Sequence, residues 1–163
     1  MKPRLIIFDL DETLVHATER DLGYPCDFEV PPYRVYLRPY VQELVEFAGS
    51  RFDIAVWSSS SDAYVSEVVD RLFSNVRPKF AWSVSRCVQR IDTRSNGYVY
   101  VKDLRKVQKF GYSTDEILIV DDSPEKISRQ PKCHIHVEPF HGSRDDAELL
   151  RVMRVLEEFE CAA

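Results

Sequence analysis

Two pairs of aspartates are the residues of this 163-residue chain whose type and spacing most clearly point to chemistry. Asp9 and Asp11 follow the apolar run LIIF, and Asp121 and Asp122 follow the apolar run ILIV. A carboxylate beside a buried strand is costly unless a cation or hydrogen bonds compensate its charge. Three or four carboxylates that meet at one point need a divalent cation, and oxygen ligands favour Mg²⁺. We therefore expect a magnesium site if the fold brings the two pairs together.

Hydroxyl and ammonium groups elsewhere in the chain could bind a phosphate. The serines at 58–61 lie between a predicted strand and a predicted helix, and hydroxyls and backbone N–H groups near a helix N-terminus bind anions. A polar loop in which one serine caps the helix explains the same run equally well. Lys102 follows the β-prone run YVYV and could reach a phosphate, although taken alone it is interpreted as a solvated surface lysine.

The hydrophobic pattern indicates the elements that must position these residues. Short, continuous apolar runs are typical of strands buried on both faces of a sheet. Amphipathic spacing with end signals is typical of helices, and Asn-Gly of a hairpin turn. The predicted strands are 4–8, 53–57, 117–121 and 133–137, the predicted helices are 38–49, 61–73, 102–111 and 143–159, and the predicted hairpin within 80–101 joins FAWSV to YVYV through Asn96-Gly97.

This alternation of strands and helices predicts an α/β fold with a mainly parallel sheet. Such sheets carry their chemistry beyond the carboxyl ends of the strands. Asp9, Ser58 and Asp121 stand at the ends of three predicted strands, so the reactive side chains fall where the fold class would place an active site.

Composition excludes several other classes of protein. The net charge is -5 and 44% of the residues are apolar, which is ordinary for a globular chain. We expect no membrane span and no signal peptide, because no apolar run is long enough for either. The five glycines are scattered, which excludes a dinucleotide-binding motif and a P-loop. The four cysteines include no C-x-x-C pair, which excludes a zinc ribbon. Reduced thiols suggest a cytoplasmic protein, or a nuclear one in a eukaryote; the oligomeric state is not indicated.

The order of the motifs resembles that of the haloacid dehalogenase (HAD) superfamily. The D-x-D-x-T motif at 9–13 could occur alone by chance, but here a serine after the second strand, a lysine and an Asp-Asp pair follow it in the family's order. Over nearly its full length the chain is similar to the FCP/SCP branch, the phosphatases of the RNA polymerase C-terminal domain and their small, NLI-interacting-factor-like relatives. The resembling stretches are DLDETLVH (9–16), LRP (37–39), the serines before Tyr64, YVKDL (100–104), VDDSP (120–124) and DDAELL (145–150).

Two departures from the branch bear on the substrate rather than on the chemistry. The branch usually has threonine where this chain has Ser58, which keeps the hydroxyl. The stretch before LRP is short and the 80–101 insert is long.

The resemblance implies one HAD-like phosphatase domain over 1–163, with a Rossmann-like core, a central mainly parallel sheet flanked by helices, and a small β-hairpin insert at about 80–101. The segments from Thr13 to Ser58 and from Ser61 to Lys102 are too short for a large cap domain of about 50 residues. We therefore expect an open site, which suits a phosphate displayed on a macromolecule.

The resemblance also implies a mechanism. Asp9 would attack phosphorus and form an aspartyl-phosphate. Asp11 would protonate the leaving oxygen and then activate water, with a pKa raised by neighbouring carboxylates. The other implied roles are Mg²⁺ binding by the Asp9 side chain, the Asp11 backbone carbonyl and Asp122; phosphate binding by Ser58, Ser59, nearby backbone N–H groups and Lys102; support of the loop by Thr13; and orientation of Lys102 by Asp121.

The uneven charge of the chain bears on its partner. Residues 75–110 hold nine basic and two acidic residues, a net charge of +7 against -12 for the rest. Such a segment is either a solvated face or a docking surface for an anionic partner. We expect a phosphoprotein, with phosphorylated Ser/Thr implied by the resemblance.

Two other functions remain as alternatives. One is a phosphatase of nucleic-acid ends or small phosphate esters, although the overall acidity gives no support for nucleic acid. The other is a non-enzymatic phospho-binding module. Zinc binding by His134, His136 and His141 is less favoured, because no cysteine or carboxylate spacing completes a site.

Overall fold

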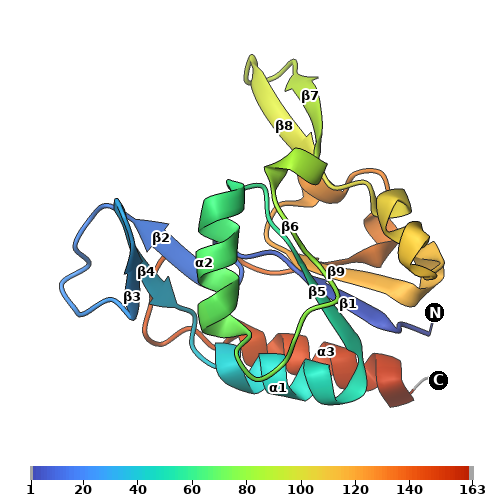
Figure 1. Cartoon of the computed structure of the whole chain (residues 1–163), viewed down its shortest axis with the longest axis horizontal. Helices are drawn as coiled ribbons and strands as arrows, with labels where there is room; N and C mark the ends of the chain where they lie inside the picture. Colours follow the sequence, from blue (N-terminus) through green and yellow to red (C-terminus); the bar gives the residue numbers. More distant parts are fainter. Residues whose placement is uncertain (1, 162–163) are drawn as a thin grey trace.

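The computed structural model describes residues 2–161 and places a five-stranded sheet, in the order β10-β9-β1-β5-β6, at the centre of the fold (Figure 1). All neighbouring strands in this sheet are parallel. The predicted α/β class with a mainly parallel sheet is therefore confirmed. The strands are β1 (Leu5–Phe8), β5 (Asp53–Trp57), β6 (Ala81–Trp82), β9 (Ile117–Asp121) and β10 (His134–His136).

The register of the sheet brings the predicted reactive residues to one edge. Phe8 lies opposite Val56 on β5 and opposite Val120 on β9. Asp9, the next residue, is therefore level with the carboxyl ends of both neighbouring strands. Its backbone N–H donates to the Val120 carbonyl at 3.0 Å, which continues the ladder by one residue and fixes the start of the loop that follows.

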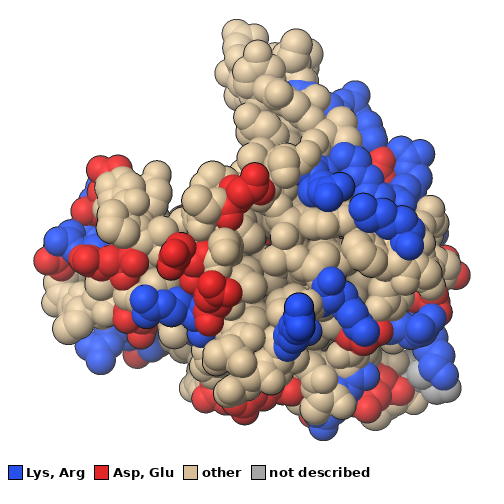
Figure 2. All heavy atoms as spheres, viewed as in Figure 1, with Lys and Arg blue, Asp and Glu red and all other residues tan. Residues whose placement is uncertain are grey.

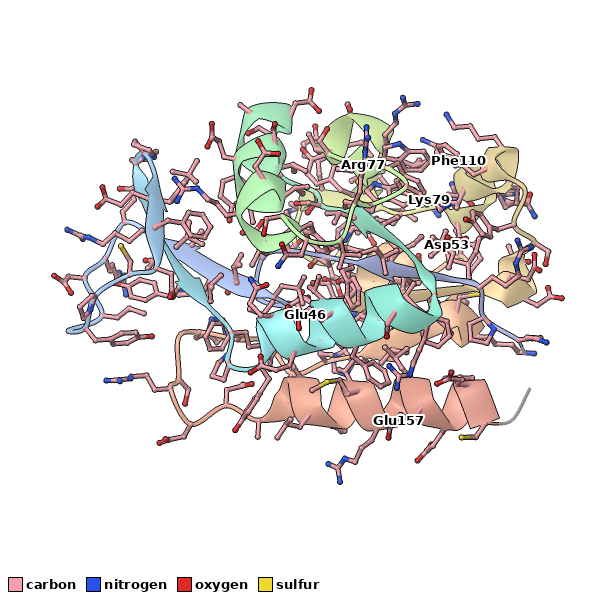
Figure 3. The ribbon with its side chains drawn as sticks, turned by 60° about the horizontal axis from the view of Figure 1, so that its bottom comes forward. Glu46, Asp53, Arg77, Lys79, Phe110 and Glu157 are labelled. Atoms are coloured by element: carbon pink, nitrogen blue, oxygen red, sulfur yellow. The ribbon has the colours of Figure 1, made fainter. Side chains whose placement is uncertain are left out.

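The two faces of the sheet are buried in separate hydrophobic cores, which explains why the strands are continuous apolar runs. Ile6 and Phe8 point into one core, and Leu5 and Ile7 into the other. The first core is covered by α1 (Val41–Arg51), α2 (Asp62–Leu72) and α3 (Glu148–Cys161), of which α1 and α3 lie side by side (Figure 3). The second is covered by the 3₁₀ helices η2 (Leu104–Phe110), η4 (Pro124–Ile127) and η5 (Pro131–Cys133).

Helix α1 differs from the predicted helix 38–49 at both ends. The chain enters it through Tyr40, whose φ of 69° is left-handed and ends any helical continuity with Pro39. Gly49 was expected to end the helix, but α1 continues to Arg51. A Cβ at position 49 would lie 2.4 Å from Cγ1 of Val76, so this glycine permits close packing against a neighbouring segment. The prediction of a terminal glycine was therefore wrong.

The other helices agree with the prediction to different degrees. Ser61 caps α2, and its hydroxyl accepts from the backbone N–H of Tyr64. The predicted helix 102–111 is the 3₁₀ helix η2, which ends at Gly111 with a φ of 89°. Helix α3 begins at Glu148 instead of 143, because Asp146 is held in an ion pair with Arg38 and keeps the preceding segment in a loop.

The hairpin within 80–101 pairs different residues from those predicted. The run FAWSV does not pair with YVYV; instead β6 joins the main sheet beside β5, where Trp82 packs edge-on against Trp57. The hairpin consists of β7 (Val88–Asp92) and β8 (Gly97–Val101), and it projects from the body of the molecule (Figure 1). A projecting ribbon has little core to contact, which is why the polar run VQRID was not recognised as a strand.

The segment between the first aspartates and α1 holds an antiparallel sheet, although no strand was predicted there from the sequence. The strands are β2 (Val15–Thr18), β3 (Phe28–Val30) and β4 (Tyr33–Leu37), in the order β2-β4-β3. Their alternation of polar and apolar residues is short and irregular, and only Val15, Val35 and Tyr36 are fully buried. This sheet is small, and no large cap domain covers the carboxyl edge in the part of the chain that the structure describes.

Candidate active site

Three of the four predicted carboxylates meet at the carboxyl edge of the sheet. Asp9, Asp121 and Asp122 each offer an oxygen that lies within 4.8 Å of the other two. Asp9 leaves β1, and the pair Asp121-Asp122 ends the adjacent β9. Parallel strands in register carry them to the same level, which is the convergence on which the expected magnesium site depends.

The fourth carboxylate, Asp11, lies apart from this cluster. Its two oxygens accept hydrogen bonds from the Ser60 hydroxyl and the Tyr64 hydroxyl, each at 2.6 Å. Burial raises the pKa of Asp11, these two hydrogen bonds oppose the rise, and the charge of Asp9 adds a smaller increase. The pKa is raised as expected, but the main cause is burial and not the neighbouring carboxylates.

Lys102 is buried, so the interpretation as a solvated surface lysine is wrong. Its ammonium donates to Asp9 Oδ1 at 2.9 Å and to Asp121 Oδ2 at 2.5 Å. Burial opposes a charge there, but the carboxylates of Asp121 and Asp9 raise the pKa of Lys102 above its ordinary value. The ammonium is therefore retained and joins the two strands β1 and β9 through their terminal aspartates.

Thr13 and Asp122 complete the acidic cluster. The Thr13 hydroxyl donates to Asp9 Oδ2 at 3.2 Å and lies 3.5 Å from Asp122 Oδ1. Burial, followed by the charges of Asp9 and Asp121, raises the pKa of Asp122 to about 6. The cluster thus holds more negative charge than Lys102 neutralises, which is the electrostatic condition for binding a cation.

The four consecutive serines have four different environments. Ser58 is buried, and its hydroxyl oxygen accepts from the backbone N–H of Ser60 at 3.0 Å. The Ser59 hydroxyl accepts from the Lys126 ammonium at 2.9 Å, the Ser60 hydroxyl contacts Asp11, and Ser61 caps α2. The run is therefore both a helix cap and a row of hydroxyls that lies beside Asp11 and Lys126.

A hollow of about 470 Å³ opens beside this row and gives solvent access to the site. It is lined by Asp11, Glu12, Tyr33, Tyr64 and the serines 59–61. A larger hollow, of about 660 Å³, is lined by residues at the opposite end of β1 and β5, among them Arg4 and Asp53, and has no part of the acidic cluster. Asp9, Asp121 and Asp122 do not line the smaller hollow either, but Asp11 and the serines 59–61 do, so it is the hollow that adjoins the candidate site.

Several residues of the site were not found from the sequence. The spacing of Tyr64 within the predicted helix 61–73 is that of a core residue, and nothing in the sequence indicates a role for its hydroxyl. Lys126 follows the VDDSP stretch, and only the fold brings it to Ser59. Its backbone carbonyl accepts from the N–H of Lys102 at 2.7 Å, so the two lysines lie on joined segments.

The basic residues of 75–110 do not form one uniform surface. Lys102 is buried in the site, Lys79 pairs with Asp53 at 3.1 Å (Figure 3), and Arg105 pairs with Asp103 at 2.6 Å. The charged groups of Arg86 and Lys109 both lie 5.3 Å from the centre of the Trp82 ring. Figure 2 shows basic side chains gathered beside the hairpin, whose face in this view is mostly uncharged, although the hairpin itself carries Arg90, Asp92 and Arg94.

The histidines separate into two places. His134 and His136 lie on β10, and each has Nε2 near a backbone carbonyl, that of Asp121 at 2.8 Å and that of Asp122 at 3.2 Å. His141 lies instead beside Glu12. The three histidines considered from the sequence therefore do not form a common site.

Comparisons with known proteins bear on this site. A model of the NLI interacting factor-like phosphatase family matches residues 4–162. A CTD phosphatase-like protein of Invertebrate iridescent virus 3 is 27% identical and covers 98% of this chain and 98% of its own length. Human carboxy-terminal domain RNA polymerase II polypeptide A small phosphatase 2 is 29% identical over 96% of this chain, which spans 57% of that protein. The chain spans 26% of CTD small phosphatase-like protein 2 of Dictyostelium discoideum, at 25% identity.

Solved structures agree on the fold. An essential RNA polymerase II CTD phosphatase superposes over 99% of this chain and 49% of its own, with a TM-score of 0.65 and 18% identity. A haloacid dehalogenase-like family hydrolase of Xanthomonas campestris superposes over 99% of this chain and 97% of its own, with a TM-score of 0.64 and 12% identity. The expected HAD core is therefore confirmed. Among residues 2–161, no helix is long and apolar enough to cross a membrane.

Proposed function

The chain belongs to the NLI interacting factor-like phosphatase family, and we propose that it is a magnesium-dependent phosphatase that hydrolyses phosphomonoesters on Ser/Thr side chains of a protein partner. The observation that carries this proposal is the convergence of Asp9, Asp121 and Asp122 around the buried ammonium of Lys102. Phosphoryl transfer depends mainly on positioning and on charge neutralisation, and these four groups serve both purposes.

The donor set fits Mg²⁺. It consists of carboxylate oxygens, which Mg²⁺ prefers, and the three carboxylates carry more negative charge than the single ammonium of Lys102 offsets. In this proposal the Asp9 side chain, the Asp11 backbone carbonyl and Asp122 hold the ion. When bound, Mg²⁺ supplies positive charge that neutralises the phosphate and the attacking oxygen.

Asp9 is the proposed nucleophile. Both of its oxygens are held, one by Lys102 and the other by Thr13, so the carboxylate keeps a single orientation. Its oxygen forms a bond to phosphorus as the ester oxygen of the substrate leaves, which yields an aspartyl-phosphate. Asp121 contacts the same lysine and would hold it in position through both steps.

Asp11 is the proposed acid and base. Its raised pKa suits a carboxyl group that gives a proton to the leaving oxygen and later takes one from the water that hydrolyses the aspartyl-phosphate. The hydroxyls of Ser60 and Tyr64 orient it, and one of these two contacts must give way when the leaving oxygen approaches.

The phosphate oxygens would be held by hydroxyl, amide and ammonium groups along the serine row. The Ser58 oxygen accepts from a backbone N–H, which leaves its own proton free to donate to a phosphate. Ser59 and Lys102 complete the set predicted from the sequence, and Lys126 adds a second ammonium 2.9 Å from the Ser59 hydroxyl. Two cations beside one phosphate would favour a dianionic ester.

The open edge of the sheet favours a macromolecular substrate over an enclosed metabolite. A phosphoprotein would dock near the basic 75–110 segment, where Arg86 and Lys109 lie over the ring of Trp82. The names of the relatives, which refer to the C-terminal domain of RNA polymerase II, support a phosphoprotein. Two alternatives are considered. One is phosphatase activity on nucleic-acid ends or small esters, and the other is a module that binds phosphate groups without turnover.

The test is phosphate release from para-nitrophenyl phosphate with Mg²⁺ and with EDTA, in the wild type, in Asp9→Asn and in Asp145→Asn. Asp145 is an exposed carboxylate outside the site, so it controls for the substitution itself. We expect turnover that needs Mg²⁺, disappears in Asp9→Asn and persists in Asp145→Asn. Turnover by Asp9→Asn would remove the nucleophile assignment.

A second comparison addresses the substrate class. A phosphoserine peptide and a 5′-phosphorylated oligonucleotide are assayed side by side at equal concentration. Preference for the peptide supports the phosphoprotein assignment, and preference for the oligonucleotide selects the alternative. Tight binding of either compound with no release of phosphate would indicate a binding module.

A further inference from the structure

Three side chains that commonly bind transition metals meet beside the acidic cluster without belonging to it. Glu12, His16 and His141 each offer one ligand atom, and these atoms lie within 4.8 Å of one another. Glu12 Oε2 is 2.6 Å from Nδ1 of His16 and 3.8 Å from Nδ1 of His141. We propose that these residues form a second metal site, for Zn²⁺ or a similar borderline-soft divalent cation.

The chemistry of the ligands distinguishes this site from the first. Two imidazoles and one carboxylate are a common ligand set for zinc with one open position, whereas Mg²⁺ prefers oxygen ligands alone. Tetrahedral zinc at ordinary bond lengths places its ligand atoms about 3.3 Å apart. The spacing between Glu12 and His141 is close to that value, and the contact between Glu12 and His16 needs to open by less than about 1 Å.

The backbone around the three ligands is held in place. Glu12 has a left-handed φ of 61°, and its carbonyl accepts from the N–H of Phe140 at 2.8 Å. This bond ties the residue before His141 to the turn that carries Glu12. On the other side of His141, the Tyr24 hydroxyl donates to the carbonyl of Gly142. The two neighbours of His141 are therefore anchored, which limits the backbone entropy that this residue would lose on binding.

An ion can reach this site from solvent. The His141 side chain is 70% exposed, and those of Glu12 and His16 are 30% and 16% exposed. The rings of His16 and His141 lie at 85° to each other with their centres 5.6 Å apart. Glu12 and His16 hold each other through their contact at 2.6 Å, so the exposed His141 can close on the ion while water takes the open position.

Two other places in the molecule could compete for the ion. His134 and His136 lie on β10 with their Nε2 atoms near backbone carbonyls, and within residues 2–161 they belong to no cluster of three metal-binding side chains. The acidic cluster itself could take Zn²⁺ when Mg²⁺ is absent. The experiment must therefore keep that cluster filled and identify which histidines respond.

The test is a Zn²⁺ titration of the full chain in excess Mg²⁺, followed by calorimetry and by the histidine side-chain ¹⁵N resonances. We expect one Zn²⁺ per chain, with resonances of His16 and His141 that shift while those of His134 and His136 do not. His141→Ala should weaken Zn²⁺ binding at least about tenfold, and the matched variant His136→Ala should leave it unchanged.

Thermal unfolding provides an independent measurement, because an ion that binds only the folded chain raises the midpoint of unfolding. We expect Zn²⁺ to raise it in the wild type and in His136→Ala but not in His141→Ala. Equal Zn²⁺ affinity in the wild type and His141→Ala, shifts confined to His134 and His136, or no Zn²⁺ binding in excess Mg²⁺ would each overturn the proposal.

Discussion

Arg38 and Asp146 form a two-pronged ion pair across 108 residues of sequence. Nε of Arg38 donates to Asp146 Oδ1 at 2.8 Å, and Nη2 donates to Oδ2 at 3.0 Å. The guanidinium is buried and also donates to the carbonyls of Thr13 at 3.1 Å and Glu138 at 2.8 Å. One side chain thus joins the loop after β1 to the segment before α3, and both of these segments flank the site.

The first prediction concerns this pair. Asp146→Asn leaves the buried guanidinium without its anion, which should lower the free energy of unfolding by about 3 kcal/mol. The exposed pair Arg51–Glu160 serves as the control, since Glu160→Gln should cost less than about 1 kcal/mol. Urea unfolding of the three proteins measures both values. Equal losses in the two variants would mean that the buried pair has no special structural role.

The second prediction concerns the hydroxyl of Tyr64. Tyr64→Phe removes a hydrogen bond that favours the ionised form of Asp11, so the pKa of Asp11 should rise further. If Asp11 acts first as the acid and then as the base, its titration governs both the acidic and the basic limb of the pH–rate profile. Both limbs should then move to higher pH. Initial rates between pH 4 and 9 test this.

Tyr33→Phe is the matched control for that experiment. Tyr33 lines the same hollow as Tyr64 but does not contact Asp11 through its hydroxyl. Its profile should coincide with that of the wild type. A profile that is unchanged in Tyr64→Phe as well would show that Asp11 does not govern the rate in this range.

The third prediction assigns Lys126 to phosphate binding. Lys126→Met removes one of two ammonium groups near the serine row, so inorganic phosphate should inhibit roughly tenfold less strongly, a change of about 1.4 kcal/mol. Lys132→Met removes an exposed lysine on η5 and should leave the inhibition constant unchanged. Equal inhibition of both variants would place Lys126 outside the phosphate site.

The fourth prediction concerns stability and pH at Asp103. Its carboxylate accepts from Arg105 at 2.6 Å, from Arg129 at 2.6 Å and from Gln130 at 3.1 Å. Despite burial, the bonds from Arg105 and Arg129 hold the pKa of Asp103 well below its ordinary value. The stability that this gives is fully present above the unfolded pKa of about 4, and it is lost as the pH falls toward the lower folded value.

Asp103→Asn should therefore destabilise the protein by about 1 kcal/mol at pH 7 and progressively less as the pH falls below 4. The figure is small because Arg105 is largely exposed to solvent. Urea unfolding at pH 7, 5 and 3 measures the difference from the wild type. A loss that stays constant between pH 7 and 3 would contradict the assignment of the effect to the ionised carboxylate.

The sequence alone was sufficient to predict four of the five strands of the central sheet and the residues at its carboxyl edge; β6 was missed because its run was assigned to the hairpin. β1, β5 and β9 are uninterrupted apolar runs because both faces of the sheet are buried, and this pattern needs no knowledge of partners. The runs β1 and β9 end in aspartate. Since parallel strands in one sheet end at the same edge, Asp9 and Asp121 could be placed together before the structure was known.

Tertiary structure decided which groups surround each of those residues. The partners of Asp11 are two hydroxyls from the start of α2, about fifty positions away, and the partner of Arg38 lies farther still. Such pairs depend on three-dimensional proximity, and no local periodicity records them. The same is true of β2, β3 and β4, whose short polar strands are stabilised by pairing with one another. The sequence determined the scaffold and the reactive groups, because the burial of a strand can be read from its local pattern of apolar residues. The fold decided the contacts of those groups, because the pairing of distant side chains cannot be read from any local pattern.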